Sequence, residues 1–96
     1  MLVVDILTPE SSVYSGEVVS VTLPGLDGTF QVLNNHAPII SALKSGSVLL
    51  ELPNSFDPEK FKSNLIQTTN DSKKIQININ GGTVELTNNK MIVLAE

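Results

Sequence analysis

The stretch LPGLDGTFQVLNNHAPIISALKSG, residues 23–46, decides the fold class. Short runs of Val, Ile, Leu and Thr are separated in it by Gly, Asn, Asp and Pro, the residues that turns select. Alternation of apolar with polar side chains is typical of strands that have one solvent-exposed face. The stretch therefore predicts strands joined by tight corners, and it places the only histidine of the chain, His36, at one of them.

The same pattern continues on both sides of this stretch. Alternating runs recur as VSVTL at 19–23, IQINI at 75–79 and TVEL at 83–86. The dipeptides Asp27-Gly28 and Asn88-Asn89 tolerate positive φ and suit hairpins. We therefore predict an all-β domain, an antiparallel β-sandwich or flattened barrel of about nine strands. The predicted strands are Val3 to Leu7, Ser12 to Tyr14, Val18 to Leu23, Thr29 to Leu33, Ile39 to Leu43, Ser47 to Leu52, Lys74 to Asn80, Thr83 to Thr87 and Met91 to Ala95.

One segment, NSFDPEKFKSNL at 54–65, departs from this pattern. Asp57 can cap a helix whose first residue is Pro58, and Phe56 and Phe61 then occupy the two positions of a hydrophobic staple. A helix shorter than about 12 residues is not stable alone in water, so this one would pack on the sandwich or on a partner. Phe56 and Phe61 are thus candidates for an extra contact surface, with local packing as the favoured alternative. The polar run QTTNDSKK that follows is interpreted as a loop or a hairpin extension.

Composition narrows the classes of function. A chain of 96 residues with 41% apolar content is one small domain whose core is marginal, so a partner would help to stabilise it. Six basic against ten acidic residues, a net charge of −4, argue against nucleic-acid binding. The absence of cysteine excludes disulfides and thiolate metal sites and favours a reducing compartment. No apolar run approaches the length of a membrane span and the N-terminus lacks signal-peptide features, so we expect an intracellular, soluble protein.

The residues offer little support for catalysis, a cofactor or a metal site. The serines closest to His36 in sequence have no reason to meet its imidazole, and Asp27, Asp57 and Asp71 are isolated. The glycines of PGLDG lack the Lys-Ser/Thr pair or the helix that accompanies phosphate-binding loops. His36-Ala37-Pro38 instead describes a rigid bend that re-enters a strand. We interpret His36 as a structural turn residue, with a partner contact as the alternative.

Longer motifs carry a family resemblance. Pro24-Gly25-Leu26-Asp27-Gly28-Thr29-Phe30-Gln31-Val32-Leu33 is followed by His36-Ala37-Pro38-Ile39-Ile40 and by Leu43-Lys44-Ser45-Gly46. DILTPESSVYSGEV at 5–18, NGGTVEL at 80–86 and NNKMIVLAE at 88–96 agree in order and spacing. Together these motifs resemble the N-terminal β-sandwich domain of the epsilon subunit of the F-type rotary ATP synthase. The resemblance covers the whole chain except 53–73, an insertion longer than the connection usual in the family. We expect one sandwich domain over residues 1–96, a short form that stops at Glu96 before the family's two-helix C-terminal domain.

The resemblance implies a non-catalytic subunit of a proton-transporting ATP synthase. Such a subunit belongs to the rotor, or central stalk, grips the gamma subunit and rests on the membrane c-ring at the cytoplasmic face of the bacterial inner membrane. It implies neither a cofactor nor a small-molecule substrate. The implied gamma contacts are His36, Ala37, Pro38, Ile39 and Ile40, and the implied c-ring contacts are Leu26, Asp27, Gly28 and Thr29. The alternative is a free-standing β-sandwich protein-binding module with similar turn chemistry.

Overall fold

The computed structural model describes all residues, 1–96, as ten strands without a helix. The strands are β1 (Leu2–Leu7), β2 (Ser12–Val18), β3 (Ser20–Gly25), β4 (Gly28–Leu33), β5 (Ile39–Leu43), β6 (Gly46–Glu51), β7 (Ile66–Thr68), β8 (Lys74–Ile79), β9 (Gly82–Thr87) and β10 (Lys90–Ala95). All nine predicted strands occur, β5 with the predicted bounds and the other eight with shifted ends. The tenth, β7, pairs antiparallel with β8 and confirms the hairpin extension that the polar run allowed.

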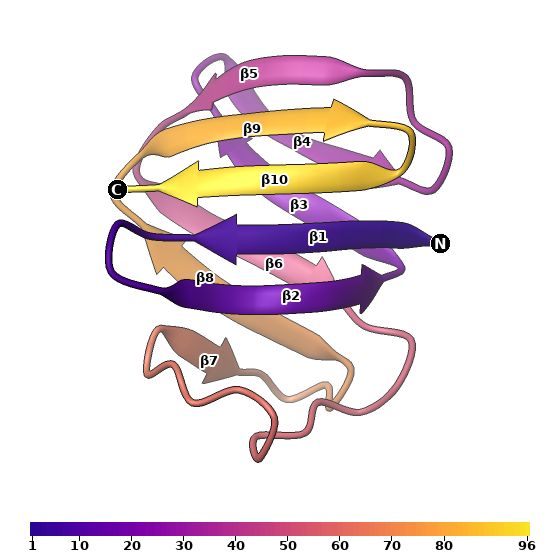
Figure 1. The fold of residues 1–96 in the computed structure, drawn as a ribbon, viewed down its shortest axis with the longest axis vertical. Helices are drawn as coiled ribbons and strands as arrows, with labels where there is room; N and C mark the ends of the chain where they lie inside the picture. The colour runs from indigo at the N-terminus through magenta and orange to yellow at the C-terminus, as the bar shows by residue number, and fades with distance from the viewer.

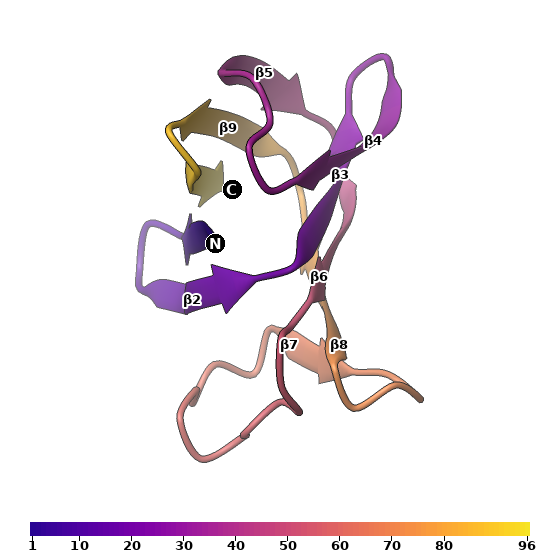
Figure 2. The same ribbon diagram turned by 90° about the vertical axis from the view of Figure 1, so that its right-hand side faces the viewer.

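The strands form two facing layers (Figures 1 and 2). One layer holds β2, β1, β10, β9 and β5, and the other holds β4, β3, β6, β8 and β7. The hydrogen-bonded path runs β2-β1-β10-β9-β5-β3-β6-β8-β7, and β4 pairs with β3 off this path. β5 joins the layers at the pairing of Leu43 with Gly25. The terminal strands β1 and β10 pair in parallel, while every other pairing is antiparallel.

The core lies between the layers and follows the alternation in the sequence. In β1, Leu2, Val4 and Ile6 are fully buried while the residues between them are partly exposed. Twenty-one buried apolar residues form one cluster drawn from both layers. A continuous apolar cluster of this kind is what a small domain requires, because burial of apolar area is its main source of stability.

The helix predicted within 54–65 is absent, and that prediction is wrong. Asp57 does act as a cap, since its carboxylate accepts from the Glu59 N–H at 3.0 Å and its carbonyl from the Lys60 N–H at 3.2 Å, but the turn ends there. Phe61 then stacks on Tyr14 of β2 with ring centroids 4.8 Å apart. This contact ends the helical turn, because a helix of two turns has little stability of its own to compete with tertiary packing. No helix that could cross a membrane occurs in the structure.

The corners use the residues that the sequence indicated. Asn88 and Asn89, between β9 and β10, have φ of 51° and 61°, as a tight hairpin with the usual strand twist requires. Asn35, in the corner after β4, has φ of 65°. Asn is one of the few residues other than glycine that adopt this left-handed conformation readily.

Candidate interaction surfaces

The structure does not bring together the side chains that a metal site requires. No three His, Asp or Glu side chains lie close enough together to hold a metal ion. His36 is exposed, and its Nδ1 lies 2.7 Å from the carbonyl oxygen of the adjacent Ala37. This is the only hydrogen bond that the imidazole makes within the chain.

A groove at one end of the sandwich brings two sets of predicted contact residues together. It is lined by the β3–β4 turn and by β5, with residues 25–30 on one side and residues 40–42 on the other. The predicted c-ring contacts Leu26 to Thr29 therefore face the predicted gamma contact Ile40. Leu26 is 62% exposed and Ile40 is 85% exposed. We call this hollow the tip groove.

The remaining predicted gamma contacts lie at a separate corner. His36 and Pro38 border a shallow polar hollow together with Asn35, Asn88 and Asn89. The Asn35 N–H donates to Asn89 Oδ1 at 2.6 Å, and Asn89 Nδ2 donates back to Asn35 Oδ1 at 3.0 Å. The segment 36–40 is therefore divided between two places, a polar corner held by amides and the apolar side of the tip groove.

A second apolar surface, which the sequence reasoning missed, lies on the outer side of the layer that contains β1 and β10. Cross-strand pairing puts Ile40, Glu85, Ile92 and Asp5 in one row. The next row contains Ala42, Thr83, Leu94 and Leu7. We call Leu7, Ile40, Ile92 and Leu94 the outer apolar face. Leu94 is 52% exposed and Leu7 and Ile92 are partly exposed.

The signal for this face is present in the sequence. VVDIL and MIVLA are apolar at nearly every position, whereas a strand with one wet face alternates. The inward residues of both strands fill the core, so Leu7, Ile92 and Leu94 point outward, with Asp5 and Lys90 as the charged members of the same face.

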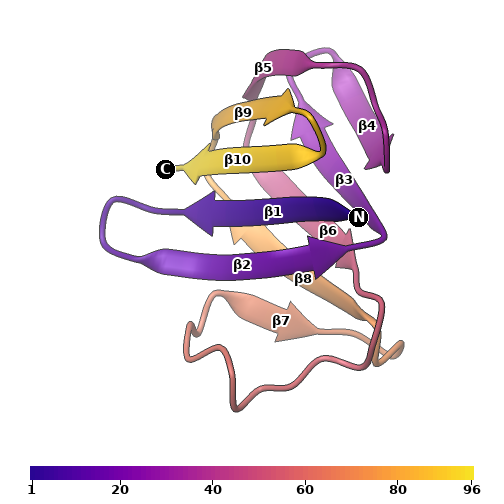
Figure 3. The same ribbon diagram turned by 45° about the vertical axis from the view of Figure 1, so that its right-hand side comes forward.

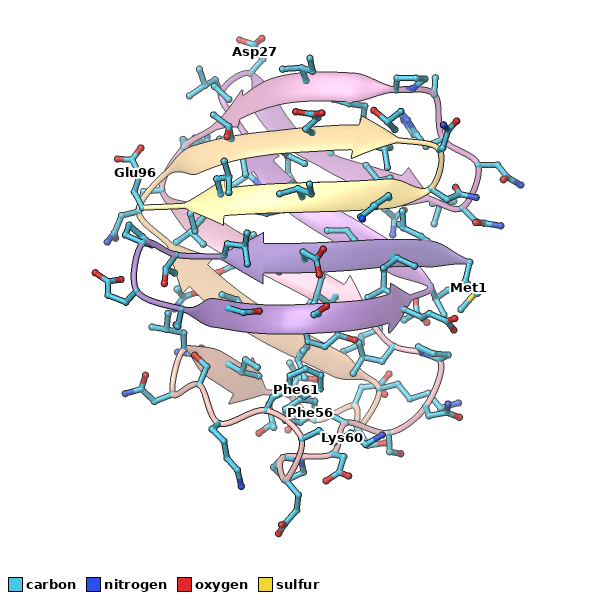
Figure 4. All side chains as sticks on the ribbon, viewed as in Figure 1. Met1, Asp27, Phe56, Lys60, Phe61 and Glu96 are labelled. Carbon is cyan, nitrogen blue, oxygen red and sulfur yellow. The ribbon has the colours of Figure 1, made fainter.

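Aromatic side chains gather at the opposite end from the β3–β4 turn. Figure 4 shows Asp27 at one end of the long axis and Phe56, Phe61 and Lys60 at the other. Phe61 stacks between Tyr14 and Phe56, with centroid distances of 4.8 and 5.9 Å. Both phenylalanines are partly buried against the core. They therefore extend the core between the unpaired ends of the strand path, β2 and β7, which supports the local-packing interpretation.

The hydroxyl of Tyr14 is enclosed by its surroundings. It donates to the Glu17 carbonyl at 3.2 Å. Burial, with a smaller contribution from the nearby Glu17 carboxylate, raises the pKa of Tyr14 above its ordinary value of 10.0. The Tyr14 hydroxyl is uncharged at neutral pH, and the Tyr14 ring packs against Phe61 of the insertion.

Relatives share this chain over nearly its whole length. An ATP synthase epsilon chain from Chlorobium limicola is 41% identical over 92 residues, which cover 96% of this chain and 85% of the relative. An ATP synthase epsilon chain from Nitratiruptor is 38% identical, and one from Helicobacter pylori is 35% identical. This chain spans 60% and 63% of the lengths of those two proteins.

Solved structures agree on the fold. A chain in the central stalk/c-ring structure of the Tetrahymena thermophila mitochondrial ATP synthase superposes with a TM-score of 0.67 at 16% identity, covering 98% of this chain and 62% of that chain. A chain of the Euglena gracilis mitochondrial ATP synthase superposes with a TM-score of 0.74 at 17% identity, covering 98% and 49%. Residues 1–96 match the family described as ATP synthase, Delta/Epsilon chain, beta-sandwich domain. The family match over the whole length, with 41% identity to a relative of which it covers 85%, shows that the chain belongs to the ATP synthase delta/epsilon chain family.

Proposed function

We propose that this chain is a central-stalk subunit of a bacterial F-type ATP synthase, where it couples the gamma subunit to the membrane c-ring and performs no bond chemistry itself. The observation that carries the proposal is the family match over residues 1–96. It favours this role over a free-standing binding module. The subunit would work as one sandwich domain at the cytoplasmic face of the membrane, held there by the complex.

The physical character of the domain supports this role. Torque passes through a coupling piece only if that piece resists deformation, and interiors packed at the density of organic crystals deform little. Twenty-one buried apolar residues and a nearly continuous ladder of strands provide such an interior. A rigid body then needs only surfaces that its partners can bind.

The outer apolar face is the surface we assign to the gamma subunit. Ile40 belongs to it and is also one of the predicted gamma contacts, and at 85% exposure it is the most exposed of the large apolar side chains, so a partner that covered it would gain free energy. Leu94 lies on the same face. Apolar side chains at the centre of an interface supply most of the binding energy, so these two residues are the expected anchors.

The turn between β3 and β4 is the surface we assign to the c-ring. Leu26, Asp27, Gly28 and Thr29 are all exposed, and Asp27 lies at one end of the long axis (Figure 4). Small polar groups on a short turn form hydrogen bonds with little loss of conformational freedom. The c-ring contact and the gamma contact would then adjoin each other across the tip groove.

Size-exclusion chromatography with the purified gamma subunit of the same organism tests the proposal. We expect a one-to-one complex. We expect the variants Ile40→Ser and Leu94→Ser to weaken its binding by about tenfold each, because each variant loses the free energy of burying one apolar side chain in the interface. Leu65→Ser is the matched control, because Leu65 is 41% exposed but lies in the insertion. If both folded proteins elute separately, the proposed function is wrong.

A further inference from the structure

The strand β4 has one edge that pairs with nothing. β4 pairs with β3 over Gly28 to Leu33 and has no second partner, because the strand path passes from β3 to β6 without it. Figure 3 shows β4 at the margin of its layer. Its free edge borders the tip groove, whose lining includes Thr29 and Phe30.

The direction of the peptide groups along β4 follows from Pro24. Proline has no N–H, and the Pro24 carbonyl accepts from the Lys44 N–H at 2.9 Å, on the side of β3 away from β4. Thr29, which is opposite Pro24, is therefore in a non-hydrogen-bonded pair. Hydrogen-bonded and non-hydrogen-bonded pairs alternate along an antiparallel ladder, so Gly28, Phe30 and Val32 form backbone hydrogen bonds with β3. The N–H and C=O groups of Thr29 and Gln31 therefore point to the free edge.

This edge lacks the features that normally prevent strand addition. Such features are charged or proline residues, bulges and very short strands. β4 has the sequence GTFQVL, with no charge and no proline. The edge strands at the ends of the path are protected, since β2 carries Glu17 and an irregular register opposite Leu7, and β7 has only three residues. β5 pairs with β3 only at Leu43, so its second edge is open and borders the same tip groove. An unprotected edge of six residues is a template for an added strand.

The tip groove indicates the chemistry of that added strand. The only charged side chain that lines it is Asp27, and its walls include Leu26, Phe30 and Ile40. The best fit is an extended, mainly uncharged segment with a basic side chain level with Asp27. A second copy of the chain is a poor candidate, because each copy carries a net charge of −4 and two copies repel each other.

We propose that the free edge of β4 binds an extended segment of the gamma subunit, which adds to the sheet as an antiparallel or parallel strand beside Thr29 and Gln31. This inference rests on the proposed function. It names a second type of contact with gamma, made by backbone hydrogen bonds, in addition to the apolar contact made by Ile40 and Leu94. The groove side of the added strand would cover Phe30 and contact Ile40.

Amide hydrogen exchange of the whole chain, alone and with purified gamma subunit, tests this inference. Alone, the amides of Thr29 and Gln31 exchange rapidly, because they have no partner. In the complex we expect both to slow by about tenfold or more, as new backbone hydrogen bonds form. The amide of Gln67, an exposed residue of β7, is the reference and stays unchanged.

A pair of variants at Gln31 separates backbone from side chain. Gln31→Pro removes the outward N–H without breaking a bond to β3, and we expect it to weaken gamma binding by about tenfold. Gln31→Ala keeps the N–H and should change binding by less than about twofold. Retained strand structure, measured by circular dichroism, checks that the proline variant folds. If the proline variant does not fold, amide exchange of the unchanged chain still tests whether the β4 edge binds gamma.

The outcomes are distinguishable. Complex formation with protected amides supports the inference. Complex formation with unprotected Thr29 and Gln31 overturns it and leaves the proposed function standing. Failure of gamma to bind overturns both. Protection that appears without gamma and increases with protein concentration assigns the edge to a second copy of the chain and also overturns the inference.

Discussion

Asn35 and Asn89 exchange two hydrogen bonds that fasten the corner after β4 to the β9–β10 hairpin. The backbone N–H of Asn35 donates to Asn89 Oδ1 at 2.6 Å, and Asn89 Nδ2 donates to Asn35 Oδ1 at 3.0 Å. The Asn89 carbonyl also accepts from the Val3 N–H at 2.8 Å. One hairpin residue therefore connects the corner that carries His36 to the first strand.

Replacement of Asn89 measures the strength of this connection. Asn89→Ala should lower the free energy of unfolding by about 1–2 kcal/mol more than Asn88→Ala, because only Asn89 loses two side-chain hydrogen bonds. Both residues have positive φ, 61° and 51°, so the backbone strain on alanine is similar in the two variants. Urea denaturation provides the measurement. Equal losses in both variants would show that the amide pair contributes nothing measurable.

Gly82 is expected to be the most sensitive glycine. It has φ of 148°, and a Cβ at this position would overlap the Leu94 carbonyl oxygen across the β9–β10 ladder. Gly82→Ala should therefore destabilise the fold by about 3 kcal/mol or more, whereas strain alone costs about 1–2 kcal/mol. Gly28→Ala is the matched control, since Gly28 has φ of 135° and an added Cβ there would meet no atom within 4 Å. Thermal denaturation of the two variants would contradict the argument if their melting temperatures fell equally.

The aromatic stack predicts a stability effect and not a binding effect. Phe61→Ala should lower the free energy of unfolding by about 1–3 kcal/mol, because it removes the ring that lies between Tyr14 and Phe56. Phe56→Ala should cost less, since Phe56 stacks on one ring only. Gamma affinity should not change, because neither phenylalanine belongs to the outer apolar face or lines the tip groove. A Phe61→Ala variant of normal stability and reduced gamma affinity would instead make the stack a contact surface.

Tyr14 predicts a loss of stability at alkaline pH. Its pKa is raised in the folded chain by burial and then by Glu17, so the unfolded chain releases the phenolic proton first as the pH increases. The contribution of the protonated Tyr14 hydroxyl to the free energy of unfolding is fully present below the ordinary pKa of 10.0. It is lost as the pH rises through the higher pKa of the folded chain. Tyr14→Phe cannot ionise, so its stability should fall less between pH 9.5 and about 11.5 than that of the unchanged chain. Parallel curves for the two proteins in denaturant titrations across this range would rule out Tyr14 as the cause.

The strands could be predicted from the sequence because their cause is local. Alternation in TVEL and IQINI predicts one buried face, and the same residues are buried alternately in β9 and β8. The turn at Asn88-Asn89 was equally predictable, since positive φ is an intrinsic preference of asparagine. The absent helix at 54–65 shows the limit of local reasoning. Asp57 caps only a single turn and not the predicted helix, because the Phe61–Tyr14 stack, which joins residues 47 positions apart, takes Phe61 to β2.

The candidate surfaces were harder to predict from the sequence than the strands, because they depend on pairing between strands that are distant in the chain. Ile40 was recognised from its motif, whereas Ile92 and Leu94 were missed, because only the register of β5, β9, β10 and β1 puts these residues on one face. The parallel pairing of β1 with β10 has no local signature, since it joins the two ends of the chain. The free edge of β4 is likewise a property of sheet order and not of the sequence GTFQVL alone.

His36 offers the most direct distinction between a turn residue and a contact residue. Its side chain is exposed, and its one hydrogen-bonding neighbour is the carbonyl of Ala37, the next residue. His36→Ala should therefore change the free energy of unfolding by less than about 0.5 kcal/mol, as for most exposed positions. If His36 contacts gamma, the same variant should weaken the complex by about three- to tenfold, measured by isothermal titration calorimetry. A large loss of stability with unchanged gamma affinity would assign His36 to the turn alone, and the gamma contact would then reside in Ile40 and the outer apolar face.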